Sequence, residues 1–246
     1  MEPVFFSMKR AHKTILIFSF VLIAASLGAV FFSLFFDQAI LTRKETLYKA
    51  RVTEKVVALT FDDGPSSDWT PRMLDELKRS GIKGTFFMLG KHVEQYPDIA
   101  RRVVEEGHEA GIHSYEHKNY IFYKKQQVEN DIKDTQKIIK DVTGQDTRLF
   151  RPPKAWLSKR EKKQIKKLGF EIVLWTLNSK DWVTFDDKLI IRYIVKNILP
   201  GDIILFHDSG GVFGTERGDR TETMKTIYPL SQKLKGMGYC FVTIEE

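Results

Sequence analysis

The sequence of 246 residues has a single cysteine, no low-complexity tract and no nucleic-acid-binding motif. One thiol excludes an intramolecular disulfide, and because Cys240 lies in the apolar run of residues 239–242, we expect it to be buried in a strand. Hydrophobic residues make up 42% of the chain, which is enough for one sizeable core. We therefore expect one folded domain and an N-terminal segment.

Acidic residues are fewer than basic residues, with 32 Asp and Glu against 39 Lys and Arg. The resulting net charge of +7 can favour anionic partners such as nucleic acid, lipid headgroups or acidic wall polymers. Lysines are concentrated in two stretches of helical periodicity, residues 124–140 and 159–167, where a solvated helix face is the simpler interpretation. Because no nucleic-acid motif accompanies them, we expect no nucleic-acid partner.

Charge is absent from one long apolar run, residues 14–36, which is long enough to cross a hydrocarbon core of ~30 Å as a helix. Lys9, Arg10 and Lys13 precede it, and positive residues favour the cytoplasmic side of a membrane. The pattern predicts a cytoplasmic segment of residues 1–13, a single transmembrane signal anchor of residues 14–36 and an extracytoplasmic remainder.

A cleaved signal peptide is the alternative, since small residues are frequent at positions 24–29. The apolar run continues beyond them to Phe36, which is long for a signal-peptide core and favours the uncleaved anchor. Residues 37–54 are polar and of mixed charge, and we predict that they form a stalk. The folded domain is then expected at residues 55–246.

Beyond the stalk, short β-rich runs alternate with stretches of helical periodicity, which predicts an α/β domain with a largely parallel sheet. Seven strands are expected, at residues 55–61, 84–89, 109–114, 147–151, 171–177, 202–207 and 239–244. Helices are expected at residues 70–80, 92–106, 124–143, 158–168, 186–197 and 221–235. Five of them would end at a glycine, namely Gly81, Gly107, Gly144, Gly169 and Gly236. This pattern favours a distorted or incomplete (β/α) barrel over an open sheet.

Polar residues are concentrated at the C-terminal ends of the predicted strands, where barrels and open α/β sheets carry their active sites. They are Asp62 with Asp63, His113 with His117, Arg151, Asp181, and His207 with Asp208. A carboxylate pair and two histidines four residues apart offer the oxygen and nitrogen ligands that zinc or a related divalent metal takes. The sequence therefore predicts a metal centre at this end of the sheet.

Structural roles are the alternative for each of these residues. The segment Asp62 to Pro65 could be an ordinary turn, because Asp-Gly and Pro favour turns. No function is expected for His12 or His92, and His108 is expected to pack or to form a hydrogen bond.

Five motifs occur in an order that resembles the polysaccharide deacetylases of the NodB-homology type, carbohydrate esterase family 4. They are Thr60-Phe61-Asp62-Asp63-Gly64-Pro65, His113-Ser114-Tyr115-Glu116-His117, Phe150-Arg151-Pro152-Pro153, Asp181-Trp182 and Leu205-Phe206-His207-Asp208. The resemblance extends from about Val56 to the C-terminus. It implies a distorted (β/α) barrel, a divalent metal and hydrolysis of N-acetyl groups on an amino-sugar polysaccharide.

The resemblance also implies a role for each motif residue. Asp62 would be the catalytic base with Arg151 as its partner, and His207 the catalytic acid with Asp181 beside it. The metal ligands would be Asp63, His113 and His117, with Zn²⁺ expected first and Co²⁺ second. Arg151 and the metal should keep Asp62 ionised, and Asp181 should raise the pKa of His207.

Substrate contacts are expected from Lys154, Trp182 and Leu205, with Trp156 as a further candidate for the pocket around the acetyl methyl group. Two positions depart from the family pattern. Lys154 and Ala155 replace an aromatic residue and a glycine, although a lysine still supplies the backbone N–H that the family uses for its oxyanion site. Asn178 replaces an aspartate three residues before Asp181.

Peptidoglycan N-acetylglucosamine is the first expectation for the substrate, and a chitin-like polymer the second. Three alternatives stay open. The enzyme could cleave O-acetyl esters of a glycan, or the chain could be a catalytically impaired wall-binding protein of the same fold. An iron oxygenase uses the same two-histidine, one-carboxylate ligand set, but its usual fold has many short strands and no long helices.

Overall fold

The structure is a computed structural model, which describes residues 12–26, 28, 37, 39–210 and 218–246. The chain divides into two compact units, Met1–Gln38 and Ala39–Glu246. In the first unit, residues 12–26 form a helix. Within the described part of the chain, no helix has both the length and the hydrophobicity that a membrane crossing requires. Of the predicted anchor, residues 27 and 29–36 lie outside the described residues.

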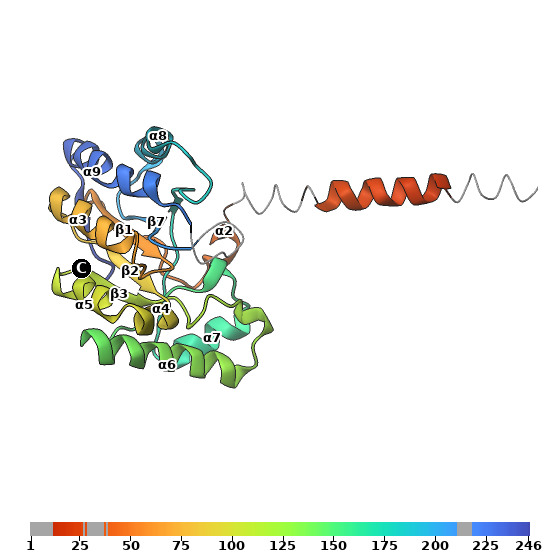
Figure 1. The fold of residues 1–246 in the computed structure, drawn as a ribbon, viewed down its shortest axis with the longest axis horizontal. Coiled ribbons are helices and arrows are strands. Elements are labelled where there is room, and N and C mark those ends of the chain that lie inside the picture. The colour runs from red at the N-terminus through yellow and green to blue at the C-terminus, as the bar shows by residue number, and fades with distance from the viewer. Residues whose placement is uncertain (1–11, 27, 29–36, 38, 211–217) are drawn as a thin grey trace, which may run out of the picture. The chain divides into compact units, whose positions relative to one another are not determined.

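The second unit is an α/β domain whose parallel sheet curls into a partial barrel with helices around it (Figure 1). The sheet order is β5-β4-β3-β2-β1-β7-β6, and β8 also pairs with β1. All of the paired strands run parallel. The strands are β1 (Val56–Asp62), β2 (Thr85–Met88), β3 (Glu109–Ile112), β4 (Leu149–Phe150), β5 (Glu171–Ile172), β6 (Leu177–Asn178), β7 (Asp202–His207) and β8 (Cys240–Val242).

The strand predicted at residues 171–177 is two strands that lie at opposite ends of the sheet path. β5 pairs with β4, whereas β6, which begins only five residues after β5 ends, pairs with β7. So few residues span at most roughly 18 Å, so the two edges must lie close together. This short connection explains why the sheet curls into a distorted barrel, as the strand count predicted.

The helices are α2 (Ala39–Thr42), α3 (Thr70–Ser80), α4 (Gly90–Gln95), α5 (Pro97–Glu105), α6 (Lys125–Thr143), α7 (Lys159–Lys167), α8 (Asp187–Asn197) and α9 (Thr221–Gly236), with short 3₁₀ turns η1 (Tyr120–Phe122) and η2 (Pro153–Ala155). The prediction of a single helix at residues 92–106 is wrong, because the structure has two helices there, α4 and α5. Tyr96 leaves the helical region, with φ −130° and ψ 57°, because Pro97 lacks an N–H and its ring excludes the helical conformation from the preceding residue.

Four of the five predicted glycine ends adopt the left-handed conformation, and Gly236 does not. Helix α9 continues through Gly236, and the positive φ lies two residues later, at Gly238. Cys240 is also placed differently from the prediction, because it is exposed. Side chains alternate along a strand, and the neighbouring Tyr239 takes the buried position.

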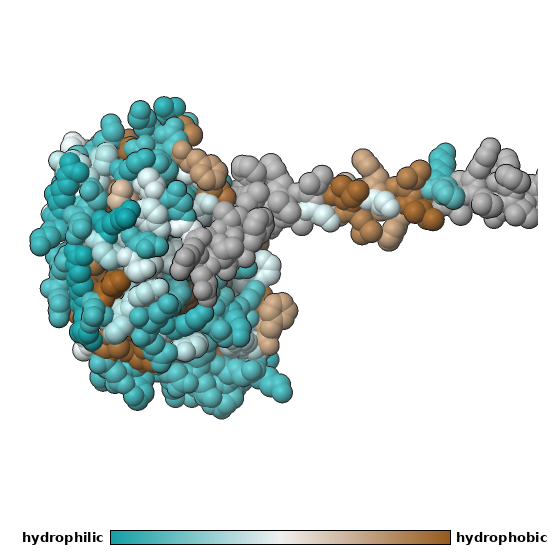
Figure 2. Space-filling model, viewed as in Figure 1, coloured by the Kyte–Doolittle hydropathy of each residue, from teal (hydrophilic) through white to brown (hydrophobic). Residues whose placement is uncertain are grey.

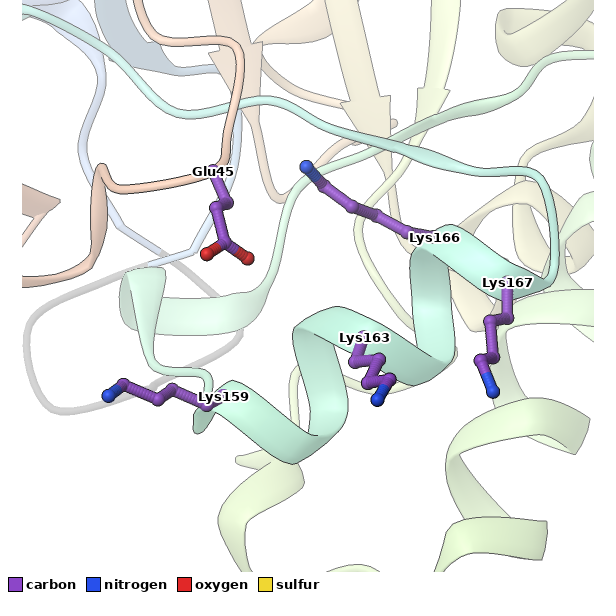
Figure 3. Close-up of a pocket in the computed structure, with 5 residues that line it drawn as sticks. All are labelled: Glu45, Lys159, Lys163, Lys166 and Lys167. Atoms are coloured by element: carbon purple, nitrogen blue, oxygen red, sulfur yellow. The ribbon is translucent and has the colours of Figure 1, made fainter.

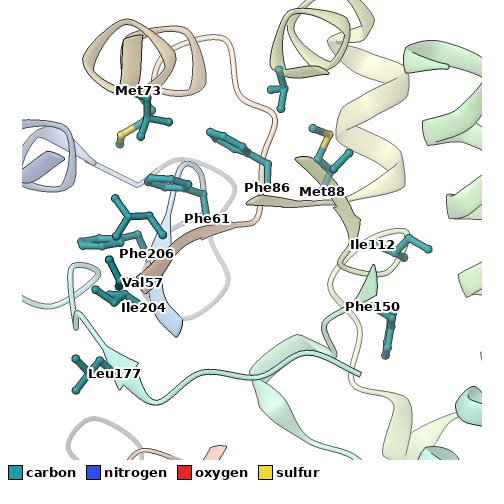
Figure 4. Close-up of a cluster of buried hydrophobic side chains, with 14 of the residues drawn as sticks. Val57, Phe61, Met73, Phe86, Met88, Ile112, Phe150, Leu177, Ile204 and Phe206 are labelled. Atoms are coloured by element: carbon teal, nitrogen blue, oxygen red, sulfur yellow. The ribbon is translucent and has the colours of Figure 1, made fainter. Parts of the chain in front are cut away.

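Alternation along the strands divides the core into two clusters, one on each face of the curled sheet. In β1, Val57, Leu59 and Phe61 belong to the outer cluster, where the Phe61 ring lies between those of Phe86 and Phe206 (Figure 4). The inner cluster contains Ala58, Phe87, Leu149, Leu174, Trp175, Ile203 and Leu205. Every residue of both clusters belongs to residues 39–246, so this unit has its own core and can fold without residues 1–38.

The segment that we predicted to be a stalk packs in part against the domain. Ala39 is fully buried in the inner cluster. The Arg43 guanidinium donates to the carbonyl oxygens of Trp175 and Thr176, each at 3.0 Å, and Lys49 Nζ lies 2.9 Å from Asp202 Oδ1. The compact unit therefore begins at Ala39, sixteen residues before the predicted start of the domain.

Candidate metal centre

The alternation that separates the two core clusters also places the site residues. Ala58 belongs to the inner cluster, so Asp62, four residues along the same strand, continues on the inner face at the C-terminal end of β1. The same rule places His113 after β3, Arg151 after β4 and His207 at the end of β7. Because parallel strands end at the same edge of the sheet, these four side chains meet inside the barrel mouth.

All three predicted ligands, Asp63, His113 and His117, lie together at this mouth. The Nε2 atoms of His113 and His117 lie 3.5 and 3.4 Å from Asp63 Oδ1, and the ligand atoms of all three residues lie within 4.8 Å of one another. Asp63 Oδ1 is buried and has no hydrogen-bond partner in the structure. An unpaired buried carboxylate oxygen beside two imidazole nitrogens fits a divalent cation, which would satisfy all three atoms.

A hydrogen bond orients His113 for metal binding. His113 Nδ1 lies 2.8 Å from the Arg151 carbonyl oxygen, so Nδ1 donates its proton and Nε2 is left with a lone pair. Burial lowers the pKa of His113 to about 3, which keeps the ring neutral. Burial raises the pKa of Asp63, but the imidazoles of His117, His207 and His113 together outweigh it and hold this pKa below its ordinary value.

Asp62 is the carboxylate that Arg151 holds. Arg151 Nη1 donates to Asp62 Oδ1 and to Thr60 Oγ1, each at 2.7 Å, and this fully buried guanidinium also faces the Phe87 ring. We expected Arg151 and a bound metal together to keep Asp62 ionised. Burial is the larger influence and raises that pKa above its ordinary value, although Arg151 opposes it. A carboxylate with a raised pKa is a stronger proton acceptor.

His207 and Asp181 form a second charged pair at the barrel mouth. His207 Nδ1 lies 2.8 Å from Asp181 Oδ1, while the His207 backbone N–H and the Thr223 hydroxyl donate to Oδ2. Burial lowers the pKa of His207, but the Asp181 carboxylate raises it more, so the pKa lies above its ordinary value, as predicted. The pKa of Asp181 lies below its ordinary value, because His207 outweighs the effect of burial. The pair can therefore hold a proton on His207.

The predicted substrate residues differ in burial. Leu205 is buried in the inner cluster two residues before His207, Trp182 is half-buried, and Lys154 and Trp156 are exposed. Ala155 adopts φ 57° where the family pattern has glycine, so the left-handed turn persists in spite of a Cβ atom. Asn178 Oδ1 accepts from the Lys180 backbone N–H at 2.9 Å.

Sequence reasoning missed several residues that support the site. His92 Nδ1 lies 2.8 Å from the backbone carbonyl oxygen of Asp63, although we expected no function for this histidine. Arg220 is buried and donates to the carbonyl oxygens of Ser209 and Gly210, which follow the His207 motif. His92 and Arg220 lie on helix α4 and just before α9, where no sequence pattern marks them. Thr60 could have been found, because alternation places it beside Asp62.

Comparison with known proteins agrees with this geometry. The polysaccharide deacetylase profile matches residues 49–173. A peptidoglycan-N-acetylglucosamine deacetylase of Bacillus cereus is 36% identical over 195 residues, which cover 78% of this chain and 88% of that protein. The chain belongs to the polysaccharide deacetylase family. It spans only 39% of the length of its Listeria monocytogenes relatives, which are larger proteins.

Solved structures of polysaccharide deacetylases share the fold. The Bc1960 peptidoglycan N-acetylglucosamine deacetylase has a TM-score of 0.76 at 29% identity, over 84% of this chain and 94% of that one. A family 4 pseudoenzyme of Bacillus anthracis has a TM-score of 0.73 at 26% identity, over 80% of this chain and 66% of that one. The fold alone therefore does not establish catalysis, which depends on the side chains at the barrel mouth.

Proposed function

We propose that this deacetylase hydrolyses N-acetyl groups of peptidoglycan, with N-acetylglucosamine as the first candidate residue. The observation that carries the proposal is the juxtaposition of three groups: the ligand set of Asp63, His113 and His117, the Asp62–Arg151 pair, and the His207–Asp181 pair. Amide hydrolysis needs an activated water, a proton acceptor and a proton donor for the leaving amine. The barrel mouth offers a candidate for each.

A divalent cation held by Asp63, His113 and His117 would supply Lewis acidity towards a water molecule and the acetyl carbonyl group. We propose Zn²⁺, because two imidazoles and one carboxylate are typical of catalytic zinc sites, with Co²⁺ as the alternative. The donor atoms come from two segments, the turn after β1 and the loop after β3, so the ligand set forms only in the folded domain.

Proton transfer is assigned to the two pairs. Arg151 occupies Asp62 Oδ1, so Oδ2, which lies 3.8 Å from His113 Nε2, is the oxygen that can take a proton from the attacking water. His207 donates Nδ1–H to Asp181 and therefore presents Nε2 to the substrate, where its proton can pass to the sugar nitrogen. Trp182 and Leu205 are proposed to receive the acetyl methyl group, and Lys154 to contact the glycan.

Incubation of the purified protein with defined glycans tests this function. We expect acetate release from peptidoglycan fragments to exceed release from N-acetylglucosamine oligomers, because several relatives are peptidoglycan deacetylases. Acetylated xylan shows whether the site also cleaves O-acetyl esters. Mass spectrometry of the products identifies the sugar that lost the acetyl group. Release from acetylated xylan alone would favour an O-acetyl esterase, and release from none would favour the impaired wall-binding protein.

We also propose that residues 14–36 anchor the protein in the cell membrane, with residues 39–246 outside the cytoplasm. Between residues 15 and 23 the large apolar side chains of the described helix are exposed, from 52% at Leu22 to 73% at Phe20. Figure 2 shows hydrophobic residues along most of this helix. An apolar surface of this kind supports a lipid or protein environment over water.

Protease added to intact protoplasts is expected to digest the domain and to leave the N-terminal segment protected. The reason is the cluster of Lys9, Arg10 and Lys13, which favours a cytoplasmic N-terminus. Immunoblots with tags at both ends check the result. A protected domain would contradict the orientation, and a secreted protein that begins near Val30 would show a cleaved signal peptide instead.

A further inference from the structure

Four lysines of α7 line a pocket of about 510 Å³ together with Glu45, which follows α2 in the chain. The lysines are Lys159, Lys163, Lys166 and Lys167, and we call this feature the lysine pocket. In Figure 3 the Glu45 carboxylate points towards α7, and the Lys166 side chain extends back towards the Glu45 segment. The pocket therefore lies between α7 and the chain that leads into the domain.

The charge in the lysine pocket is largely uncompensated. No ion pair joins any of its four lysines to a carboxylate in the described part of the chain. On α6, by contrast, Lys133, Lys137 and Lys140 each pair with an acidic residue, at 2.7, 2.5 and 2.9 Å. The sequence analysis expected a solvated helix face in both stretches. These three lysines of α6 are neutralised by ion pairs, whereas the lysine pocket retains an excess of positive charge.

Glu161, the only acidic residue of α7, does not neutralise the pocket, because its carboxylate caps the start of the helix. Glu161 is buried and accepts from the Ser158 backbone N–H at 2.7 Å in the capping box of the helix. Lys162 is buried as well, and its Nζ donates to the carbonyl oxygens of Thr42 and Lys44. These bonds fix α7 against residues 42–44, so the lysine pocket is held in place by the fold.

The position of the pocket along the chain indicates its ligand. Ala39 is fully buried in the domain and follows Phe36, the last apolar residue of the proposed anchor, by only three residues. Three residues span at most roughly 11 Å. On α2, Ile40 and Leu41 are 53% and 69% exposed. If residues 14–36 cross the membrane, the short connection limits how far the start of α2 can lie from the lipid headgroups. The lysine pocket adjoins the segment that follows α2.

We propose that the lysine pocket binds the phosphate groups of anionic phospholipids and holds the α2–α7 side of the domain against the bilayer. The inference rests on the proposed membrane anchor, not on the proposed reaction. Basic residues near exposed apolar side chains are typical of membrane-surface contacts, and several lysines close to an anionic surface attract it together. The pocket adds a second attachment to that of the anchor.

Vesicle co-sedimentation of residues 39–246 tests the proposal without the anchor. At low salt, we expect binding to vesicles of phosphatidylglycerol and phosphatidylcholine, and none to phosphatidylcholine alone. Lys163→Gln with Lys166→Gln should weaken this binding about tenfold or more, because each lysine near an anionic surface contributes separately. The matched control, Lys133→Gln with Lys137→Gln, removes the same charge from α6 and should change the binding less than about twofold. Glutamine preserves helix propensity in both pairs.

Equal losses in the two pairs would overturn the proposal, because binding would then follow net charge alone. Binding to a soluble glycerol phosphate polymer without binding to vesicles would also overturn it and would point to an anionic wall polymer. Acetate release by the same variants, measured on soluble glycan fragments, should equal that of the unsubstituted unit. A protein that binds vesicles but releases no acetate would contradict the proposed reaction and leave the lipid site supported.

Discussion

Asp62→Asn is expected to lower kcat by roughly 10²–10⁴-fold, the usual size of a lost general base, at unchanged metal content. Asparagine keeps the shape of the side chain and can still accept from Arg151, but its amide does not take up a proton. The metal donors are on Asp63, His113 and His117, which this change leaves in place. Steady-state kinetics measure the fall in kcat, and metal analysis of the same sample measures the metal content.

Stability has to be measured beside the rate, because the substitution leaves the buried Arg151 without its charged partner. Besides the asparagine amide, Arg151 keeps three contacts, to the Thr60 hydroxyl and to the carbonyl oxygens of Val173 and Leu174. Losing the partner of a buried ion pair costs about 3–5 kcal/mol, so a lower melting temperature is expected. The assay therefore belongs well below that temperature.

Asp208→Asn is the matched control, because Asp208 is a second buried carboxylate at the same end of the sheet. It accepts a hydrogen bond from Thr70 Oγ1 at 2.6 Å, and burial raises its pKa to about 7. No catalytic role is assigned to it, so kcat should fall by less than about tenfold. Equal losses in both variants would mean that Asp62 acts through the local structure. If wild-type protein releases no acetate and Asp62→Asn supports the cell equally well, the impaired wall-binding protein replaces the enzyme as the interpretation.

The candidate site residues converge because two simple rules act on the sequence together. Active-site residues collect where parallel strands end, and side chains alternate between the two faces of each strand. Asp62, His113, Arg151 and His207 satisfy both rules, so their convergence follows from strand assignments that were correct to within a few residues. His117 and Asp181 lie on loops beyond the strands, and the sequence placed them in the cluster because each follows a predicted strand. The family resemblance supplied their individual roles.

Predictions failed where a local rule conflicted with a tertiary contact. Residues 37–54 are polar enough for a stalk, but Arg43 donates a hydrogen bond to a backbone carbonyl of the domain and Lys49 forms an ion pair with it. Residues 171–177 have the composition of one strand, yet their two ends pair with different neighbours, β4 and β7, at the two edges of the curled sheet. Pairing partners are not encoded in the composition of a strand, so only the folded structure reveals this division.

Loss of a metal ligand is expected to affect binding first and rate as a consequence. His113→Ala should lower the affinity for Zn²⁺ by more than about 100-fold, because changes to residues that merely orient ligands already cost about 10–100-fold. Treatment with a chelator should abolish activity in the unsubstituted protein, and Zn²⁺ or Co²⁺ should restore it. Metal content after dialysis, measured by elemental analysis, gives the comparison directly.

A buried histidine outside the site provides the control for that experiment. His108 is 4% exposed, accepts from the Gly84 backbone N–H and lies edge-on to the Phe86 ring, so His108→Gln should leave the metal content unchanged. Unchanged metal content in His113→Ala would instead remove that residue from the ligand set.

Asp63→Asn completes the test, because Asp63 adjoins Asp62 in the chain but is assigned a different role. The amide is a weaker ligand than the carboxylate, so metal occupancy should fall, and excess metal should restore part of the activity. In Asp62→Asn the metal content is already full, so added metal should restore none. The difference follows from the structure, in which Asp62 Oδ1 bonds to Arg151 while Asp63 Oδ1 faces His113 and His117 without a hydrogen-bond partner. If excess metal restores both variants equally, the two carboxylates share the metal and the assignment of a separate base is wrong.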